Sequence, residues 1–196
     1  MIKIIFSTFL TVVLAACSSS GYINPHIKIQ TKLGDIEIEL YRDKAPETVK
    51  AFLSYVDSGL YRNSYFYRVL NDQNQPSDAF KANFIQGGIW KSARRKSQTL
   101  QGIPHESTKQ TAILHKDGVI SLARLEPGTA TTEFFICLGD QPGFDYGGDN
   151  NPDKQGYAAF GKVISGMDVV NKIYNEPEYD QTFDPLVSIF NITRKH

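Results

Sequence analysis

Residues 65–70 read Tyr-Phe-Tyr-Arg-Val-Leu, and residues 83–88 read Asn-Phe-Ile-Gln-Gly-Gly. Both runs are rich in aromatic or β-branched residues, whereas the passage between them, residues 71–82, is polar and contains Pro76. Apolar runs bounded by turn-forming residues are typical of strands. This stretch therefore predicts two strands joined by a loop, and we take the pair as the centre of the fold.

Arg68 is a permanent cation in the middle of the first of these strands. Side chains alternate between the two faces of a strand, which predicts that Arg68 shares a face with Phe66 and Leu70. Two interpretations are open. In one, Arg68 lies at an edge, with its stem packed and its head in water. In the other, its guanidinium lies at the rim of an apolar pocket and binds a substrate.

The chain around this pair predicts further short strands and two helices. A hairpin is expected at residues 27–41. Pro46 and Glu47 suit the first turn of a helix that Gly59 ends, and a second helix is expected at residues 167–174. Many short strands with turn signals and no repeat predict one mainly β domain, either a closed β-barrel or a sandwich. The remaining strands are expected at residues 118–123, 133–139, 156–164 and 185–192, with irregular chain at residues 89–111.

The first residues are a different kind of sequence. Residues 4–13 are apolar and residues 14–17 read Leu-Ala-Ala-Cys. The apolar run is too short to span a membrane and predicts a secretory signal peptide at residues 1–16. The residues that end it resemble a bacterial lipobox, which implies lipid on Cys17, a tether at residues 17–25 and a domain at residues 26–196. Ser rather than Asp follows the Cys, and the sorting rule known for lipoproteins of enteric bacteria then implies anchoring to the outer membrane of the cell envelope, facing the periplasm.

The composition and motifs argue against several classes of function. Hydrophobic residues make up 41% of the chain, charged residues make up 21%, and the formal net charge is zero. This balance argues against a disordered tail protein and against electrostatic capture of nucleic acid. The four His lack the spacing of a zinc site, no Gly-x-Ser-x-Gly motif occurs, and Cys137 lies in an apolar run where a buried, inert thiol is expected. We expect no cofactor, no metal, no nucleic acid and a monomer.

Several runs resemble, in sequence and in order, the signature runs of cyclophilin-type peptidyl-prolyl cis-trans isomerases. The match covers nearly everything from Ile27 to Ile192. It implies a closed eight-stranded antiparallel β-barrel capped by two α-helices, with a shallow external groove. The runs are Phe-Tyr-Arg-Val at 66–69, Ile-Gln-Gly-Gly at 85–88, Ser-Leu-Ala at 121–123, Phe-Phe-Ile-Cys at 134–137 and Phe-Gly-Lys-Val at 160–163.

The resemblance implies roles for individual positions. Arg68 matches the catalytic arginine of the family, Gln86 the glutamine that orients it, and Phe135 the floor of the proline pocket. Arg124 is expected to offer backbone groups to the bound peptide. The full set of positions expected to bind substrate is Phe66, Phe84, Gln86, Ala123, Arg124, Glu133, Phe135, Phe144 and Tyr157.

Three positions depart from the family pattern. Asn83 stands where a pocket Phe is common, so either Phe84 replaces that Phe or the pocket has lost one aromatic wall. Glu133 stands where Gln is usual and adds a negative charge available to pair with Arg68. Gly143 takes the place of a Trp that helps to bind cyclosporin, so weak cyclosporin binding is expected.

The resemblance favours the second interpretation of Arg68 and implies isomerase activity on proline-containing polypeptides. Rotation about an Xaa-Pro bond breaks amide resonance but forms no covalent bond, so the reaction needs no nucleophile. Two other classes stay open. One is a peptide-binding or chaperone module that has lost catalysis, which Asn83 and Glu133 support. The other is a ligand-carrying barrel of lipocalin type, which bulky interior residues disfavour.

Overall fold

The structure is a computed structural model in which residues 23–195 are described. The predicted signal peptide at residues 1–16, Cys17 and the first part of the predicted tether lie outside the described residues. Within residues 23–195, no helix is both long enough and apolar enough to cross a membrane.

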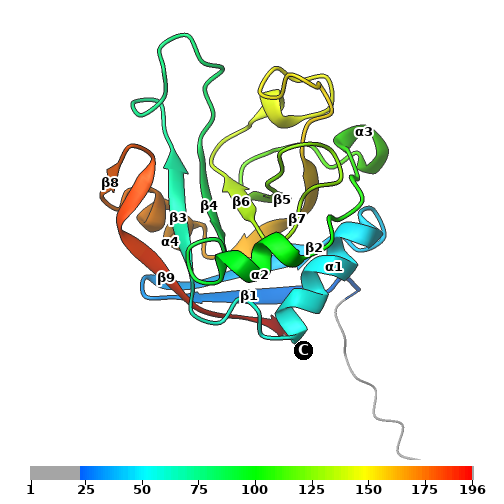
Figure 1. The fold of residues 1–196 in the computed structure, drawn as a ribbon, viewed down its shortest axis with the longest axis vertical. Coiled ribbons are helices and arrows are strands. Elements are labelled where there is room, and N and C mark those ends of the chain that lie inside the picture. Colours follow the sequence, from blue (N-terminus) through cyan, green and yellow to red (C-terminus); the bar gives the residue numbers. More distant parts are fainter. Residues whose placement is uncertain (1–22, 196) are drawn as a thin grey trace, which may run out of the picture.

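The strands form one closed antiparallel β-barrel (Figure 1). Around the barrel the order is β1-β2-β7-β5-β6-β4-β3-β9, and β9 pairs back onto β1. Because β1 pairs with both β2 and β9, the sheet is closed, so the fold is the barrel and not the sandwich. The short β8 (Glu178–Tyr179) pairs only with β9. The barrel strands are β1 (His26–Thr31), β2 (Gly34–Leu40), β3 (Ser64–Leu70), β4 (Phe84–Gly88), β5 (Val119–Leu122), β6 (Phe134–Cys137), β7 (Ala158–Ser165) and β9 (Thr182–Lys195).

The first hairpin shows how the sequence pattern fills the interior. Ile27 lies opposite Ile38, Ile29 lies opposite Ile36, and all four side chains are fully buried. Apolar residues at every second position put one face of each strand inward. Large side chains complete the interior, which leaves the barrel packed rather than hollow and argues against the lipocalin-type alternative. The fully buried aromatic residues are Phe52, Tyr61, Phe66, Phe134, Phe160 and Phe183.

Two helices pack their apolar faces onto this interior, as the sequence predicts. They are α1 (Pro46–Asp57) and α4 (Met167–Tyr174). At the start of α1, the Glu106 carboxylate accepts hydrogen bonds from the backbone N–H groups of Glu47 and Thr48 at 3.2 and 2.8 Å. These bonds satisfy two of the N–H groups that a helix leaves unpaired at its start. The interior contacts are made by Val49, Phe52, Leu53 and Val56 of α1 and by Val169, Val170 and Ile173 of α4.

Residues 89–111 contain two short helices where the sequence predicts irregular chain. They are α2 (Arg94–Thr99) and α3 (Thr108–Thr111), and a 3-10 turn, η1 (Pro142–Phe144), occurs further on. Elements of three to six residues are too short to show a helical apolar period, so the sequence gives no signal for them.

The strict alternation expected along β3 is wrong. The register of β3 against both β4 and β9 shifts between Phe66 and Arg68. This irregularity is a β-bulge, which adds a residue to one strand and re-aims the side chains that follow. As a result Phe66 points into the barrel, whereas Arg68 and Leu70 lie on the outer side.

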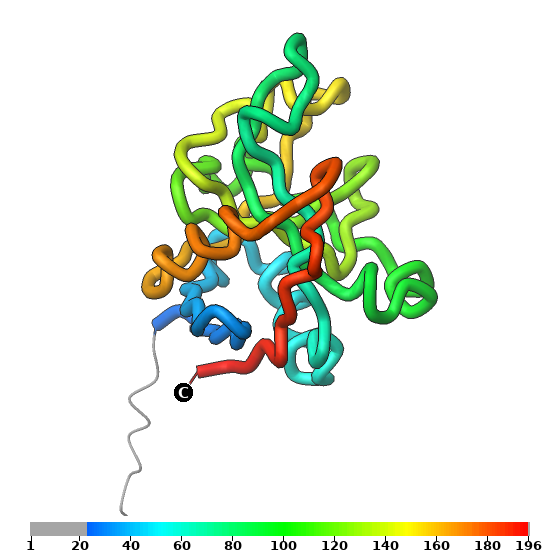
Figure 2. The backbone as a smooth tube through the Cα atoms, turned by 90° about the vertical axis from the view of Figure 1, so that its left-hand side faces the viewer, coloured from blue at the N-terminus to red at the C-terminus, as the bar shows by residue number. Residues whose placement is uncertain are grey.

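The two long loops, residues 71–83 and residues 138–157, stand on the same side of the barrel (Figures 1 and 2). They meet where the Asn150 side chain donates to the backbone oxygen of Phe80 at 2.9 Å. The turn between β8 and β9 lies beside the start of the first loop, because the backbone N–H of Val69 donates to the oxygen of Gln181 at 2.9 Å. The bulge, the loops and this turn together shape the outer surface near Arg68.

Candidate active site

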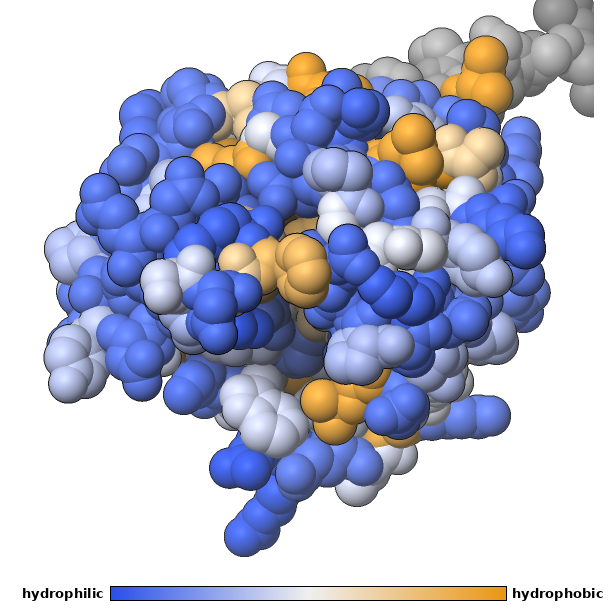
Figure 3. All heavy atoms as spheres, turned by 90° about the horizontal axis from the view of Figure 1, so that it is seen from above, coloured by the Kyte–Doolittle hydropathy of each residue, from blue (hydrophilic) through white to orange (hydrophobic). Residues whose placement is uncertain are grey.

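A groove with a volume of ≈680 Å³ lies on the outer surface of the barrel. Its lining comes from β3, β4 and β6, from the segments that follow β4 and β5, and from the chain before β7. Most of the protein surface seen from the side of the long loops is hydrophilic, with apolar side chains reaching the surface in separate patches (Figure 3). The groove is therefore a local apolar site on a polar face.

Arg68 lies in the wall of this groove and is half-buried. Its Nη1 donates to Oε1 of Gln86 at 3.4 Å, and its Nε and Nη2 donate to Oε1 of Gln181 at 3.2 and 2.8 Å. Burial lowers the pKa of the guanidinium, an effect that the nearby Tyr67 and Tyr157 oppose. Because an arginine side chain keeps its proton in proteins, the groove contains a permanent, partly desolvated cation.

Gln86 links Arg68 to Tyr67. The Gln86 Nε2 donates to the Tyr67 hydroxyl at 2.7 Å while its Oε1 faces Nη1 of Arg68. Burial, followed by the charge of Glu133, raises the pKa of Tyr67, so its hydroxyl stays protonated. The amide therefore has a defined orientation, with the acceptor toward the cation.

Four aromatic rings form the apolar part of the groove. Phe135 lies at the centre, with ring centroids 5.2 Å from Phe84, 5.2 Å from Phe144 and 5.3 Å from Tyr157. Tilted and edge-to-face contacts at this spacing stabilise aromatic clusters. The guanidinium carbon of Arg68 lies 5.6 Å from the centroid of Phe84, so the cation borders the aromatic pocket. The structure thus brings together the predicted residues Arg68, Gln86, Phe84, Phe135, Phe144 and Tyr157.

The uncertainty at Asn83 and Phe84 is resolved by the side-chain contacts. Phe84 packs in the aromatic cluster. Asn83 instead donates to Asp72 at 3.2 Å and accepts from the Tyr174 hydroxyl at 2.9 Å. The pocket therefore has an aromatic wall at Phe84, and Asn83 connects the loop at 71–83 with α4.

Ala123 and Arg124 follow the end of β5 and line the groove as predicted. The backbone N–H of Ala123 already donates to the oxygen of Glu133 at 2.9 Å. The Arg124 side chain has a structural role that the sequence did not reveal. Its Nη1 and Nη2 donate to the two carboxylate oxygens of Asp153 at 2.6 and 2.9 Å, and its Nε donates to the oxygen of Gly156 at 2.9 Å. This fork fixes the chain that leads to Tyr157.

Glu133 also lines the groove, but its carboxylate accepts hydrogen bonds from partners other than Arg68. Its Oε1 accepts from the backbone N–H groups of Ile89 and Trp90 at 3.0 and 3.1 Å and from the Thr132 hydroxyl at 3.0 Å. Burial raises the pKa of Glu133, against the lowering effect of these hydrogen bonds and of Tyr67. The carboxylate is turned toward the chain after β4 because that chain supplies backbone donors.

Phe66 does not line the groove, which corrects its expected role in substrate binding. Its side chain is fully buried and packs edge-on against Phe134 at 5.8 Å between ring centroids. The bulge in β3 is the physical reason, since it separates the face of Phe66 from the face of Arg68.

The sequence analysis missed several groove residues, of which Tyr67 and Trp90 are the aromatic ones, and it also missed Gln181. Tyr67 and Trp90 line the groove, and Gln181 holds Arg68 from outside it. Trp90 stands two residues after the matched Gly-Gly run at 87–88, so its position next to the site was a usable signal. Tyr67 was hidden by the assumption of strict alternation, and no local pattern marks Gln181.

Other kinds of site are not supported within the described residues 23–195. No group of three or more His, Cys, Asp or Glu side chains there is placed to hold a metal ion. Cys137 is buried as predicted, and burial raises the pKa of its thiol. A thiol in this state lacks the thiolate character of a nucleophile.

A closed antiparallel barrel with an arginine and an aromatic pocket on its outer surface defines the cyclophilin class of proteins. The model of the cyclophilin type peptidyl-prolyl cis-trans isomerase family (Pro_isomerase) matches residues 26–194. A peptidyl-prolyl cis-trans isomerase of Acinetobacter baylyi is 38% identical over 82% of this chain and 77% of its own length. Peptidyl-prolyl cis-trans isomerase B of Escherichia coli is 35% identical over 75% of this chain and 82% of its own.

The fold comparison agrees with the sequence comparison. A crystal structure of a cyclophilin type isomerase from Cryptosporidium parvum superposes with a TM-score of 0.68 at 22% identity, covering 88% of this chain and 98% of that one. The chain belongs to the cyclophilin-type peptidyl-prolyl cis-trans isomerase family, and its activity is the cis-trans isomerisation of Xaa-Pro bonds.

Proposed function

We propose that Arg68 accelerates this isomerisation by donating a hydrogen bond to the proline nitrogen as the amide twists. In the planar amide the nitrogen lone pair is delocalised, and it becomes an acceptor only when rotation breaks the resonance. A donor directed at that position binds the transition state better than the substrate, which is the requirement for catalysis. The observation that carries the proposal is the half-buried cation of Arg68 next to the aromatic pocket around Phe135.

The energy required fits a site of this kind. A rate increase on the order of 10³ to 10⁵-fold needs about 4–7 kcal/mol off a barrier of ~18–20 kcal/mol. One hydrogen bond to a charged group contributes about 1.5–3 kcal/mol. The remainder falls to the aromatic residues, which hold the proline ring while the preceding carbonyl rotates.

The test is proline isomerisation of a short Xaa-Pro peptide by Arg68→Ala and Arg68→Lys variants. We expect Arg68→Ala to lose at least about 10-fold in kcat/KM, the equivalent of one hydrogen bond to a charged group, while the melting temperature stays within a few degrees. Lys keeps the charge but not the planar fork, so partial activity is expected. An Arg68→Ala variant that folds and turns over at the normal rate would remove Arg68 from the mechanism.

The proposed substrates are proline-containing polypeptides. A second structure of the Cryptosporidium parvum isomerase was determined in the presence of the dipeptide Ala-Pro, and a proline ring matches the apolar pocket of Phe84, Phe135 and Phe144 in chemistry. The rival function is a peptide-binding chaperone without turnover. Turnover of an Xaa-Pro peptide decides between the two, because a holdase would suppress aggregation of an unfolded protein yet leave the isomerisation rate unchanged.

The proposed location is the bacterial cell envelope, with Cys17 lipidated and anchored to the outer membrane. The support is the Leu-Ala-Ala-Cys run at residues 14–17, preceded by a short apolar segment. Growth of a bacterial host with labelled fatty acid should label the full chain but not a Cys17→Ala variant. Label in both chains, or in neither, would contradict the anchor at Cys17.

We also propose that cyclosporin binds weakly, because Gly143 replaces the family Trp that helps to bind it. A Cβ on Gly143 would meet the side-chain oxygen of Asn150, so a larger residue there would require the Asn150 side chain to move. Titration of the described domain with cyclosporin should show no tight complex. A tight complex would contradict the assignment of Gly143 to the Trp position.

A further inference from the structure

Gln181 lies in the turn between β8 and β9 and is separated from Arg68 by 113 positions in the sequence. Its backbone φ of +65° is in the left-handed region. Its side-chain oxygen nevertheless accepts two hydrogen bonds from Arg68, from Nε at 3.2 Å and from Nη2 at 2.8 Å. One acceptor thus occupies the edge of the guanidinium formed by these two nitrogens.

The contact with Gln181 is closer than the contact with Gln86. Gln86 accepts from Nη1 of Arg68 at 3.4 Å, near the limit of a hydrogen bond, and its own amide nitrogen is committed to Tyr67. Gln181 therefore fixes the rotation of the guanidinium about its terminal bonds. Of the five guanidinium hydrogens, Gln181 and Gln86 together take three, so one hydrogen on Nη1 and one on Nη2 are left for the groove.

The amide of Gln181 is itself held in one orientation. Its Nε2 donates to the backbone oxygen of Asn74 at 3.1 Å, in the loop at 71–83. Rotating the amide by half a turn would set its NH₂ against the Arg68 cation and its oxygen against a carbonyl oxygen. The backbone is fixed as well, because the Gln181 N–H donates to Glu178 at 2.8 Å and the Gln181 oxygen accepts from Val69 at 2.9 Å.

We propose that Gln181 is a positioning residue that sets the direction of the Arg68 guanidinium, with the Asn74 carbonyl fixing the amide that does so. The inference rests on the proposed role of Arg68. A free arginine side chain has several rotatable bonds, and holding it before the reaction removes that ordering cost from the transition state. The extended loop at 71–83 thereby acquires a role at the site without touching the substrate.

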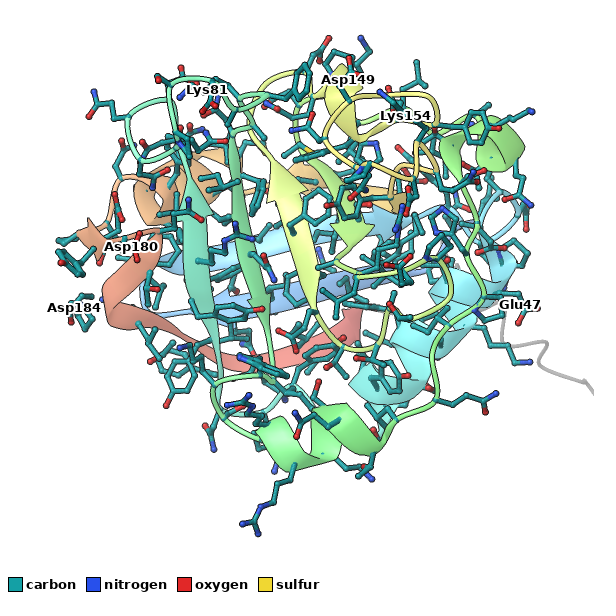
Figure 4. All side chains as sticks on the ribbon, turned by 45° about the horizontal axis from the view of Figure 1, so that its top comes forward. Glu47, Lys81, Asp149, Lys154, Asp180 and Asp184 are labelled. Carbon is teal, nitrogen blue, oxygen red and sulfur yellow. The ribbon has the colours of Figure 1, made fainter. Side chains whose placement is uncertain are left out.

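Gln181→Asn is the sharpest variant. Asn is well tolerated at a positive φ and keeps the amide, so the change shortens the reach to Arg68 and to the Asn74 oxygen while it leaves the backbone contacts of residue 181 in place. We expect kcat/KM on an Xaa-Pro peptide to fall about 10-fold, with the melting temperature and the peptide Kd close to those of the unmodified protein. Asp180→Asn is the matched control, because Asp180 is exposed in the same turn and also has a positive φ, +49° (Figure 4). It should leave kcat/KM unchanged.

Two further measurements separate positioning from a general structural effect. In NMR spectra, hydrogen exchange of the Arg68 Nε–H should be faster in Gln181→Asn and unchanged in Asp180→Asn. Gln181→Glu keeps an acceptor oxygen at full reach but loses the donor to the Asn74 oxygen, so its kcat/KM should lie between that of Gln181→Asn and that of the unmodified protein.

The proposal is overturned if Gln181→Asn keeps normal kcat/KM, if its loss is matched by Asp180→Asn, if the exchange of the Arg68 Nε–H does not change, or if Gln181→Glu is no better than Gln181→Asn. Arg68→Ala, measured in the same assay, distinguishes a failure of the role of Gln181 from a failure of the proposed role of Arg68. Low activity of Arg68→Ala with normal activity of Gln181→Asn rejects only the role of Gln181. Normal activity of Arg68→Ala rejects the proposed mechanism itself.

Discussion

His115 and Asp145 lie 2.8 Å apart, from Nδ1 of the ring to Oδ1 of the carboxylate, directly behind the aromatic pocket. The other ring nitrogen of His115 is 3.0 Å from the hydroxyl of Ser121, and the ring stacks on Phe135 at 6.0 Å. Ser121 is fully buried, so this Ser-His-Asp chain has no access to a substrate. It supports the floor of the pocket from below.

The first prediction concerns the pH dependence of stability through His115. Burial lowers the pKa of His115, although the hydrogen bond to Asp145 opposes the shift. The unfolded chain, with a His pKa of about 6.5, therefore binds the proton more readily than the folded protein does. The contribution of His115 to the free energy of unfolding should therefore be complete above about pH 6.5. It should decline as the pH falls from there to the pKa of the folded state.

Denaturant unfolding of the His115→Gln variant at several pH values checks this. The variant should lose the part of the slope that lies below about pH 6.5. His105→Gln is the control, because His105 lies in a loop, where a nitrogen of its ring lies 3.1 Å from the oxygen of Gln155. An equal change of slope in both variants would contradict the assignment to His115.

The second prediction concerns the fork between Arg124 and Asp153. The Arg124 side chain is 1% exposed and that of Asp153 is 27% exposed, so the pair is only partly screened by water. The two hydrogen bonds from Arg124 lower the pKa of Asp153 to about 2. Asp153→Asn should lower the free energy of unfolding by about 1.5–3 kcal/mol, because a buried cation loses its partner.

The same change should raise KM, since the fork positions the chain before Tyr157. Because the pKa of Asp153 is lowered, its stabilisation is present at neutral pH and is lost only in acid, as the pH falls from about 4 toward 2. Asp149→Asn is the comparison in the same loop: Asp149 pairs with Lys154 and both are exposed (Figure 4). If Asp149→Asn lowers the free energy of unfolding as much as Asp153→Asn does, the fork between Arg124 and Asp153 stabilises the protein no more than an exposed ion pair.

The third prediction uses two neighbouring phenylalanines on opposite faces of β6. Phe134 packs inside the barrel and Phe135 forms the floor of the groove. Phe135→Leu should raise KM for an Xaa-Pro peptide several-fold, because the proline ring loses an aromatic contact. Phe134→Leu should cost stability on the order of 1 kcal/mol and leave KM unchanged. Peptide kinetics and thermal unfolding of both variants test this prediction. A rise in KM for Phe134→Leu but not for Phe135→Leu would show that the proline pocket does not lie on the face of Phe135.

The fourth prediction concerns the buried carboxylate of Glu133. Burial raises its pKa, so the folded protein holds this proton more tightly than the unfolded chain does. The free energy of unfolding should therefore fall as the pH rises from about 4.5 through the folded pKa. Glu133→Gln removes this titration and keeps an acceptor for Ile89 and Trp90.

Chemical denaturation at pH 4.5 and pH 7 checks the behaviour of Glu133. At pH 7 the Gln variant should be more stable than the original protein, at pH 4.5 the difference should be smaller, and the variant should keep its isomerase activity. Glu126→Gln, an exposed change in the loop before Glu133, should alter neither value. Loss of stability on removing the charge at Glu133 would mean that the ionised form is favoured by the fold.

The sequence by itself determined most of the barrel and the centre of the site. The hairpin at residues 27–41 and the apolar stripe from Val49 to Val56 follow from side-chain periods of two and of 3.6 residues. These periods are properties of a single segment of sequence, so they can be recognised without knowing which other segments pack against it. The resemblance carried by the short runs identified Arg68, Gln86 and Phe135, which the structure brings to one groove.

Only the tertiary structure decided which way individual side chains face and what holds them. The bulge in β3 is a feature of its pairing with β4, where two steps along β3 match one step along β4, and it sends Phe66 inward and Arg68 outward. Glu133 turns to backbone donors rather than to Arg68, and Gln181 reaches Arg68 across 113 positions. These outcomes depend on strand register and on contacts between distant segments, which no period within a single stretch of sequence encodes.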